Sequence, residues 1–93
     1  MASAKKRNRL EVIRDILTVI QHKNGTIKPT HILYKSNLSH AMMEEYLEEL
    51  MEKEFIREEK KGAHRTYSLT QKGAQYLQQY RLISEFSESF GLG

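Results

Sequence analysis

Residues 55–73 constrain the fold of this chain more than any other part of the sequence. Two short segments in which apolar and polar residues alternate, residues 55–58 and 65–69, flank a turn that contains Gly62. This pattern predicts an antiparallel β-hairpin, and the chain then runs directly into Thr70, a residue type that favours the start of a helix. The hairpin tip would carry four basic or ionisable side chains: Lys60, Lys61, His64 and Arg65.

A core helix is predicted near the N-terminus. Asn8 and Glu11 have the spacing of a capping box, and the helical pattern continues until Asn24 and Gly25. Its apolar face would comprise Leu10, Ile13, Ile16, Leu17 and Ile20. The isolated β-branched Ile27 beyond this helix predicts a short edge strand against the hairpin.

Two shorter helices are expected before the hairpin. Thr30 is expected to cap a brief helix that ends at about Ser36, and Ser39 to cap the next helix, which ends near Lys53. The second of these would bury Met43, Tyr46, Leu47, Leu50 and Met51. Two helices joined by a tight turn and followed by a hairpin make a winged helix-turn-helix.

The C-terminal segment predicts a long helix with an unpartnered apolar stripe. A helix over residues 71–90 is about 30 Å long, more than the small body can cover. The stripe comprises Tyr76, Tyr80, Ile83 and Phe90 in heptad-like spacing. It is flanked by Leu77 and by Phe86, which is also an expected dimer contact. We expect it to pair with the same helix of a second copy in an isologous dimer. The alternative is that Phe86 and Phe90 fold back onto the first helix of their own chain.

The expected fold class is therefore mainly α with a small β-hairpin (α+β). Its expected parts are a basic N-terminal arm over residues 1–8, a winged helix-turn-helix domain over 9–70, a dimerisation helix over 71–90 and a frayed tail over 91–93.

Charge is segregated along the chain. The net charge is +3, yet residues 1–40 hold eight basic and two acidic side chains, residues 41–59 two and eight, and residues 60–82 five and none. A polyanionic partner should be attracted to the N-terminal arm and the hairpin and repelled by the middle. The alternative is a solvated surface on which charges cluster by chance.

Several classes of function lack candidate residues. A chain of 93 residues without cysteine forms one small domain with no disulfide, thiolate nucleophile or zinc finger. No apolar run has signal-peptide or membrane length, so we expect a soluble, cytoplasmic protein. The four histidines have no metal-binding spacing: His22, His31, His40 and His64. Without a phosphate loop or nucleophile elbow, we expect no enzyme activity, cofactor or small-molecule ligand.

An ordered set of residues resembles the small archaeal winged-helix DNA-binding proteins of the 10a chromatin-protein type. The resemblance covers roughly residues 5–85 and rests on Gly25, Lys28, Thr30, Ile32, Tyr34, Asn37, Leu38, Ser39, Tyr46, Leu47, Leu50, Glu52, Lys53, Ile56, Tyr67, Leu69, Thr70, Lys72 and Gly73. It implies a domain whose last helix pairs with a second subunit and which binds DNA without a cofactor. Glu54 departs from the pattern, which usually has glycine there. The preceding helix must end either with a left-handed non-glycine residue, at a cost of roughly 1 kcal/mol, or with a different geometry.

A second departure concerns the helix expected to face DNA. The arc opposite its buried stripe collects Ala41 and five carboxylates: Glu44, Glu45, Glu48, Glu49 and Glu52. Because carboxylates and phosphates repel, we expect only the first turn, residues 39–42, to enter a groove. Ala41 and Met42 could touch thymine methyl groups, and Glu45 could accept from a cytosine amine. The alternatives are that Ser39 is only a cap, His40 only packs, and the remaining side chains are solvated.

The expected DNA-binding residues are Lys5, Lys6, Arg7, Arg9, Lys28, Lys35, Ser39, His40, Met42, Lys60, Lys61, His64 and Arg65, with Arg14 extending the basic face. The predicted function is weakly specific or sequence-tolerant binding of double-stranded DNA as a homodimer. The protein would act as a transcriptional regulator or chromatin-associated factor and would be nucleoid-associated. The rival hypothesis is a protein-interaction adaptor that uses the acidic helix face over residues 44–52.

Overall fold

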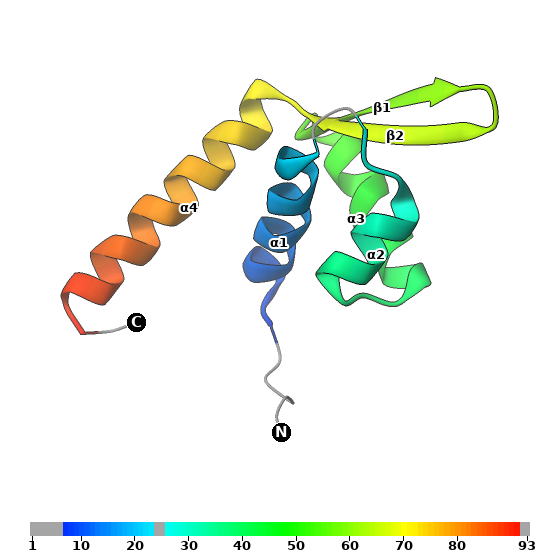
Figure 1. Ribbon diagram of the computed structural model, residues 1–93. Coiled ribbons are helices and arrows are strands. Elements are labelled where there is room, and N and C mark those ends of the chain that lie inside the picture. The colour runs from blue at the N-terminus through cyan, green and yellow to red at the C-terminus, as the bar shows by residue number, and fades with distance from the viewer. Residues whose placement is uncertain (1–6, 24–25, 92–93) are drawn as a thin grey trace.

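The computed structural model describes residues 7–23 and 26–91. The elements follow the order α1 (Arg9–His22), α2 (Pro29–Ser36), α3 (His40–Glu52), β1 (Ile56–Lys61), β2 (His64–Leu69) and α4 (Gln71–Ser89). Figure 1 shows α1, α2 and α3 gathered under the base of the hairpin, while the hairpin and α4 extend in different directions. The predicted fold class, a winged helix-turn-helix with a long C-terminal helix, is confirmed.

The first helix begins with the predicted capping box. The Asn8 side chain accepts from the Glu11 backbone N–H at 2.8 Å, and the Glu11 side chain accepts from the Asn8 N–H at 3.0 Å. The buried face is Val12, Ile13, Ile16, Leu17 and Ile20. Leu10 is 56% exposed, so its predicted place in the core is wrong. Helical spacing sets the direction of a side chain, but not whether another element lies opposite it.

The core joins the three helices to the base of the hairpin. Tyr67 of β2 is fully buried, and its N–H donates to the Ile27 carbonyl at 3.1 Å in an isolated antiparallel bridge. The predicted short strand at Ile27 is thus confirmed. From α3 the core takes Met43, Leu47 and Leu50, while the other two expected members, Tyr46 and Met51, are only partly buried.

The second helix begins differently from the prediction. Lys28 is its N-cap without a side-chain hydrogen bond, and Pro29 occupies the first turn, so the predicted cap at Thr30 is wrong. Proline suits the first helical position because its φ is already helical and it lacks an N–H that would need a partner. The left-handed Asn37, at φ 54°, then ends the helix.

The third helix begins with the predicted cap and ends in one of the two ways expected for a chain without glycine at position 54. The Ser39 hydroxyl accepts from the Met42 N–H at 3.2 Å. Beyond the helix Glu54 has φ 64°, so the non-glycine left-handed end is the one that occurs. The chain can then turn sharply into β1.

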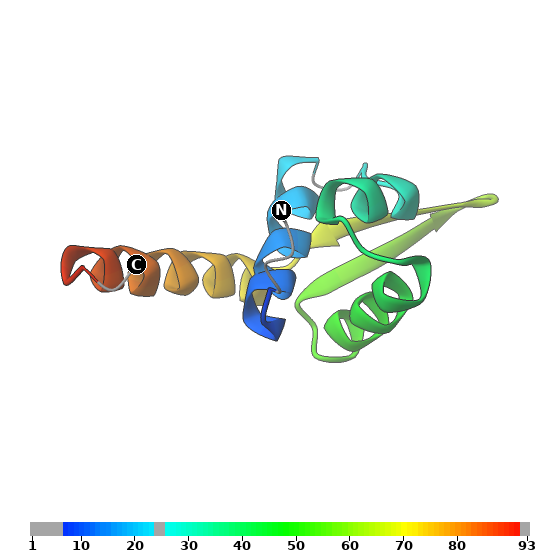
Figure 2. The same ribbon diagram turned by 90° about the horizontal axis from the view of Figure 1, so that it is seen from below.

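The hairpin is longer at its tip than predicted. Its register runs from Ile56 opposite Leu69 to Lys61 opposite His64, so both tip lysines belong to β1 rather than to a loop. Only two residues remain for the turn, and Gly62 takes a left-handed φ of 61° there. Figures 1 and 2 show the hairpin reaching well past the helices.

The last helix starts on the body and then leaves it. The Thr70 hydroxyl accepts from the Gly73 N–H at 3.1 Å, as predicted for its cap. Figure 2 shows the C-terminal half of α4 extending away from the other helices. Phe86 and Phe90 are 65% and 66% exposed, so these side chains do not fold back onto α1.

Candidate nucleic-acid interface

The N-terminal ends of α2 and α3 and the hairpin border a shared groove of about 320 Å³. Among its lining residues are Lys28 and Thr30 from α2, His40 and Glu44 from α3, and His64 and Arg65 from β2. The fold therefore brings together four of the expected DNA-binding residues from three elements that are separate in the sequence. One carboxylate, that of Glu44, lies among them.

The first turn of α3 presents small and ionisable groups to solvent. His40 and Met42 are exposed, whereas Met43 points into the core with 1% exposure. Ser39 is the N-cap, so its hydroxyl is already engaged by the helix. His40 Nε2 lies 3.8 Å from Glu44 Oε2, one helical turn further along.

Arg65 links the hairpin to α3. Its Nη2 donates to Glu44 Oε2 at 3.3 Å, and its Nη1 lies 3.5 Å from Glu58 Oε2. Tyr67 completes this network by donating its hydroxyl to Glu58 Oε2 at 3.1 Å. Burial raises the pKa of Tyr67 to about 12, which extends to more alkaline pH the range over which this hydroxyl can donate.

The register of the hairpin pairs basic residues of the two strands near the tip. Lys60 lies opposite Arg65, and Lys61 lies opposite His64. Residues that are directly opposite in an antiparallel pair share a face, and successive residues alternate between faces. Lys60 therefore lies on the same face of the hairpin as Arg65.

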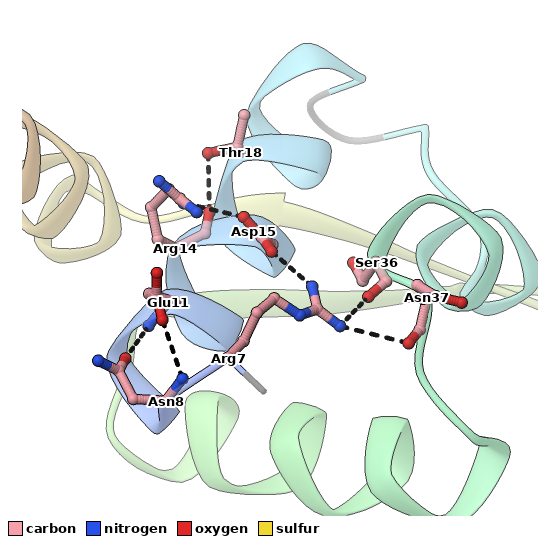
Figure 3. A network of polar contacts seen from close by, with 8 residues as sticks. All are labelled: Arg7, Asn8, Glu11, Arg14, Asp15, Thr18, Ser36 and Asn37. Carbon is pink, nitrogen blue, oxygen red and sulfur yellow. Dashed lines mark hydrogen bonds and ion pairs between the residues drawn. The ribbon is translucent and has the colours of Figure 1, made fainter. Parts of the chain in front are cut away.

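The arginine of the expected N-terminal arm is held against the protein itself. Figure 3 shows Arg7 reaching from the start of α1 to Asp15 and to the carbonyls of Ser36 and Asn37 at the end of α2. The two carbonyl contacts measure 2.7 and 3.3 Å. Arg7 thus connects α1 to the turn that precedes α3. Lys5 and Lys6 lie outside the described residues.

Two further arginines of α1 have intramolecular partners. Arg9 forms an ion pair with Glu49 of α3 and lies over the Tyr46 ring at 5.7 Å. Arg14 donates to Asp15 at 2.8 Å and lies over the Tyr80 ring at 5.1 Å. Sequence patterns missed these roles because the partners of Arg9 and the ring partner of Arg14 are brought close only by folding.

The lysines at the two ends of α2 are exposed and form no ion pair within the described part of the chain. Lys28 and Lys35, at the two ends of this helix, were both expected DNA-binding residues. Three residues beside Lys35 were not among the expected DNA-binding residues: His22, Lys23 and His31. Together with Lys35, Val19 and Ile27 they line a hollow of about 340 Å³. Each of these basic residues lies at or near an end of α1 or α2. The packing of α1 against α2 brings them together.

The carboxylates of α3 divide into paired and solvent-facing groups. Glu49 accepts from Arg9 and lies 3.6 Å from Lys53, and these cations hold its pKa below the ordinary value despite the opposing effect of desolvation. The exposed carboxylates of α3 are Glu45, Glu48 and Glu52. The outward face of α3 is therefore acidic beyond its first turn.

Within residues 7–23 and 26–91, no three metal-binding side chains form a group that could hold an ion. Nor does any helix in that part of the chain have the length and apolar character needed to cross a membrane.

Fold and groove together define a winged helix-turn-helix protein. The model of that family, described as winged helix-turn-helix, matches residues 6–88. The chain belongs to the winged helix-turn-helix family. No curated protein sequence matches it significantly.

Solved structures with this fold include two archaeal proteins. Sso10a-2, a DNA-binding protein from Sulfolobus solfataricus, has a TM-score of 0.78 and 18% identity over 90% of this chain and 85% of that one. AF1382 from Archaeoglobus fulgidus has a TM-score of 0.71 and 19% identity over 87% of this chain and 91% of that one. The predicted resemblance to 10a-type proteins is thus confirmed as a likeness of fold.

A bacterial structure extends the comparison. ZitR from Lactococcus lactis, solved in complex with DNA, has a TM-score of 0.65 and 16% identity, and the match covers 97% of this chain but 62% of ZitR. At such low identity the likeness concerns the fold alone.

Proposed function

We propose that this protein binds double-stranded DNA as a homodimer with weak sequence preference. It acts in the cytoplasm as a transcriptional regulator or chromatin-associated factor. The observation that carries the proposal is the convergence of Lys28, His40, His64 and Arg65 on one groove between three elements. Basic side chains that protrude from a small body can replace counterions along a phosphate backbone.

The proposed contacts divide by element. The tip of the hairpin, with Lys60 and Lys61, contacts the backbone or an adjacent minor groove. The first turn of α3, residues 39–42, enters the major groove, and Lys28 and Lys35 contact phosphates beside it. Lys5 and Lys6 are proposed to add phosphate contacts, whereas Arg7 and Arg9 are engaged by the protein itself and act indirectly by holding α1 to α2 and α3.

Weak specificity follows from the acidic arc of α3. Beyond the first turn, its exposed carboxylates Glu45, Glu48 and Glu52 would face phosphates if the helix lay along the groove. Repulsion between like charges opposes that arrangement. Contacts with bases are then few, and backbone contacts and DNA shape dominate the recognition.

The proposed dimer uses the free end of α4. Four apolar residues there are 55–69% exposed: Leu82, Ile83, Phe86 and Phe90. At 100° per residue they lie within an arc of about 100°, which makes a continuous stripe. Tyr76 and Tyr80 instead face their own body, since the Tyr76 hydroxyl donates to the Leu10 carbonyl at 3.1 Å and Tyr80 stacks on Tyr76. We therefore place the dimer contact in the last turns and add Leu82 to it.

One observation favours the adaptor as a second candidate. The exposed carboxylates of α3 form an acidic face that a basic protein segment could bind, with the winged helix serving only as a scaffold. This candidate predicts no affinity for duplex DNA at low salt.

The test is a titration of random and genomic duplexes at several salt concentrations. The proposal expects binding with a logarithmic salt slope near −0.9 per phosphate neutralised, and similar affinities for the two DNA pools. Absence of binding at low salt would refute it and favour the adaptor. A strong preference for one genomic sequence would refute weak specificity.

A further inference from the structure

A carboxylate of the protein lies in the groove to which the proposed function assigns DNA binding. Glu44 borders the groove together with His40 and Arg65. Its Oε2 atom is 3.3 Å from Arg65 Nη2 and 3.8 Å from His40 Nε2. The same oxygen thus approaches one nitrogen from the hairpin and one from the first turn of α3.

We infer that His40 and Arg65 form an anion site which Glu44 occupies in the DNA-free protein, and that a backbone phosphate of bound DNA competes with Glu44 for it. This inference rests on the proposed function and identifies a residue that limits its affinity. The two nitrogens come from α3 and the hairpin, the two elements proposed to contact DNA. A phosphate oxygen carries negative charge and accepts hydrogen bonds, as a carboxylate oxygen does, so it can take the same place.

The position of Glu44 distinguishes it from the other carboxylates of α3. Glu49 is paired with Arg9 and Lys53 near the opposite end of the helix. Glu45 is exposed and takes part in no ion pair within the described residues. Glu44 alone among the described carboxylates of α3 pairs with Arg65 and approaches His40, so it alone would compete directly with a phosphate there.

The exchange need not detach the hairpin from the body. Arg65 has a second carboxylate partner, Glu58 of β1, at 3.5 Å through its other terminal nitrogen. Glu58 is further fixed by the Tyr67 hydroxyl, whose ring is fully buried. Arg65 can therefore keep its orientation through Glu58 while its Nη2 exchanges Glu44 for a phosphate.

The neutral substitution Glu44→Gln tests this competition, because an amide oxygen can still accept from Arg65 without the negative charge. The matched control is Glu45→Gln, which changes net charge equally on the adjacent residue. Affinity for a random duplex is measured at low salt. We expect Glu44→Gln to tighten binding by about fivefold and Glu45→Gln by less than about twofold.

The variant Arg65→Ala, alone and combined with Glu44→Gln, completes a double-mutant cycle. If Glu44 acts through the anion site, the gain from Glu44→Gln shrinks to the size of the Glu45→Gln effect when Arg65 is absent. Melting temperatures and circular dichroism of all variants establish that the fold is retained.

The outcomes separate the inference from the proposed function. Equal gains for the two glutamine variants would mean that only net charge matters and would overturn the inference. Weaker binding by Glu44→Gln would also overturn it, by showing that the carboxylate positions Arg65 for DNA. Failure of the wild-type protein to bind DNA would refute the proposed function and the inference with it.

Discussion

A Cβ atom at position 73 would lie 2.3 Å from the carbonyl oxygen of Phe55. The same oxygen accepts hydrogen bonds from the N–H and the hydroxyl of Thr70, at 3.1 and 3.0 Å. At residue 73 the first turn of α4 is in direct contact with the backbone that leads into β1. Only glycine fits there without displacing backbone.

The substitution Gly73→Ala is therefore expected to destabilise the protein. In an exposed helix interior this change stabilises by about 1 kcal/mol. Here the added methyl group meets a backbone oxygen, so we expect a loss of about 1–3 kcal/mol in the free energy of unfolding. Urea denaturation measures it, with Gln75→Ala, an exposed site in the same helix, as the near-neutral control. An equally stable or more stable Gly73→Ala protein would contradict the close contact.

Helix capping offers a test at two hydroxyl residues. Ser39→Ala removes an N-cap hydrogen bond from the start of α3 and should cost about 1 kcal/mol. Thr30→Ala should change stability by less than about 0.5 kcal/mol, since Thr30 is exposed and is not the N-cap of α2. Thermal or urea unfolding compares the pair. A larger loss at Thr30 than at Ser39 would show that α2 begins with the threonine cap after all.

Arg7 is expected to matter for stability through its geometry as well as its charge. Its guanidinium contacts Asp15 and two carbonyls at once, which a lysine amine cannot reproduce. Both Arg7→Ala and Arg7→Lys should lose about 1 kcal/mol, a value reduced by the partial exposure of the pair. Lys28→Ala, an exposed cation without an ion pair in the described residues, is the control. If Arg7→Lys were as stable as the wild type, the bridging role would be wrong.

The free end of α4 predicts the oligomeric state. Replacing both Phe86 and Phe90 with Ser should convert a dimer to a monomer, because these rings are exposed and pack on each other at 4.9 Å between centroids. Replacing the exposed Gln78 and Gln79 with Ser should leave the dimer intact. Sedimentation equilibrium at micromolar concentration reads out the mass. A monomeric wild-type protein would exclude the proposed dimer.

Local features of the sequence were predicted well. The caps at Asn8, Ser39 and Thr70 depend on residues three positions apart, and a short pattern contains all the information. The hairpin and the single bridge at Ile27 were likewise signalled by alternation and by neighbouring turn residues. The error at Thr30 arose because a proline one position earlier sets the start of a helix more strongly than a capping hydroxyl.

The electrostatic arrangement could not be predicted from the sequence. Arg9 and Glu49 are 40 positions apart, and Arg65 and Glu44 are 21 apart. Counting charge by segment placed the basic residues correctly along the chain, but it could not show which of them the protein's own carboxylates would engage. Tertiary packing also decides which side of α4 meets the body, and so turned Tyr76 and Tyr80 inward.

The salt dependence of DNA binding by a hairpin-tip variant tests the central claim most directly. Changing Lys60 and Lys61 together to Ala should weaken binding and flatten the logarithmic salt slope by up to about two units. The control changes Lys53 and Arg57 to Ala, which removes the same charge from the end of α3 and the base of the hairpin, and it should leave the slope nearly unchanged. Equal slopes for the wild-type and tip-variant proteins, or equal flattening by the control, would contradict the claim that the tip grips the DNA backbone.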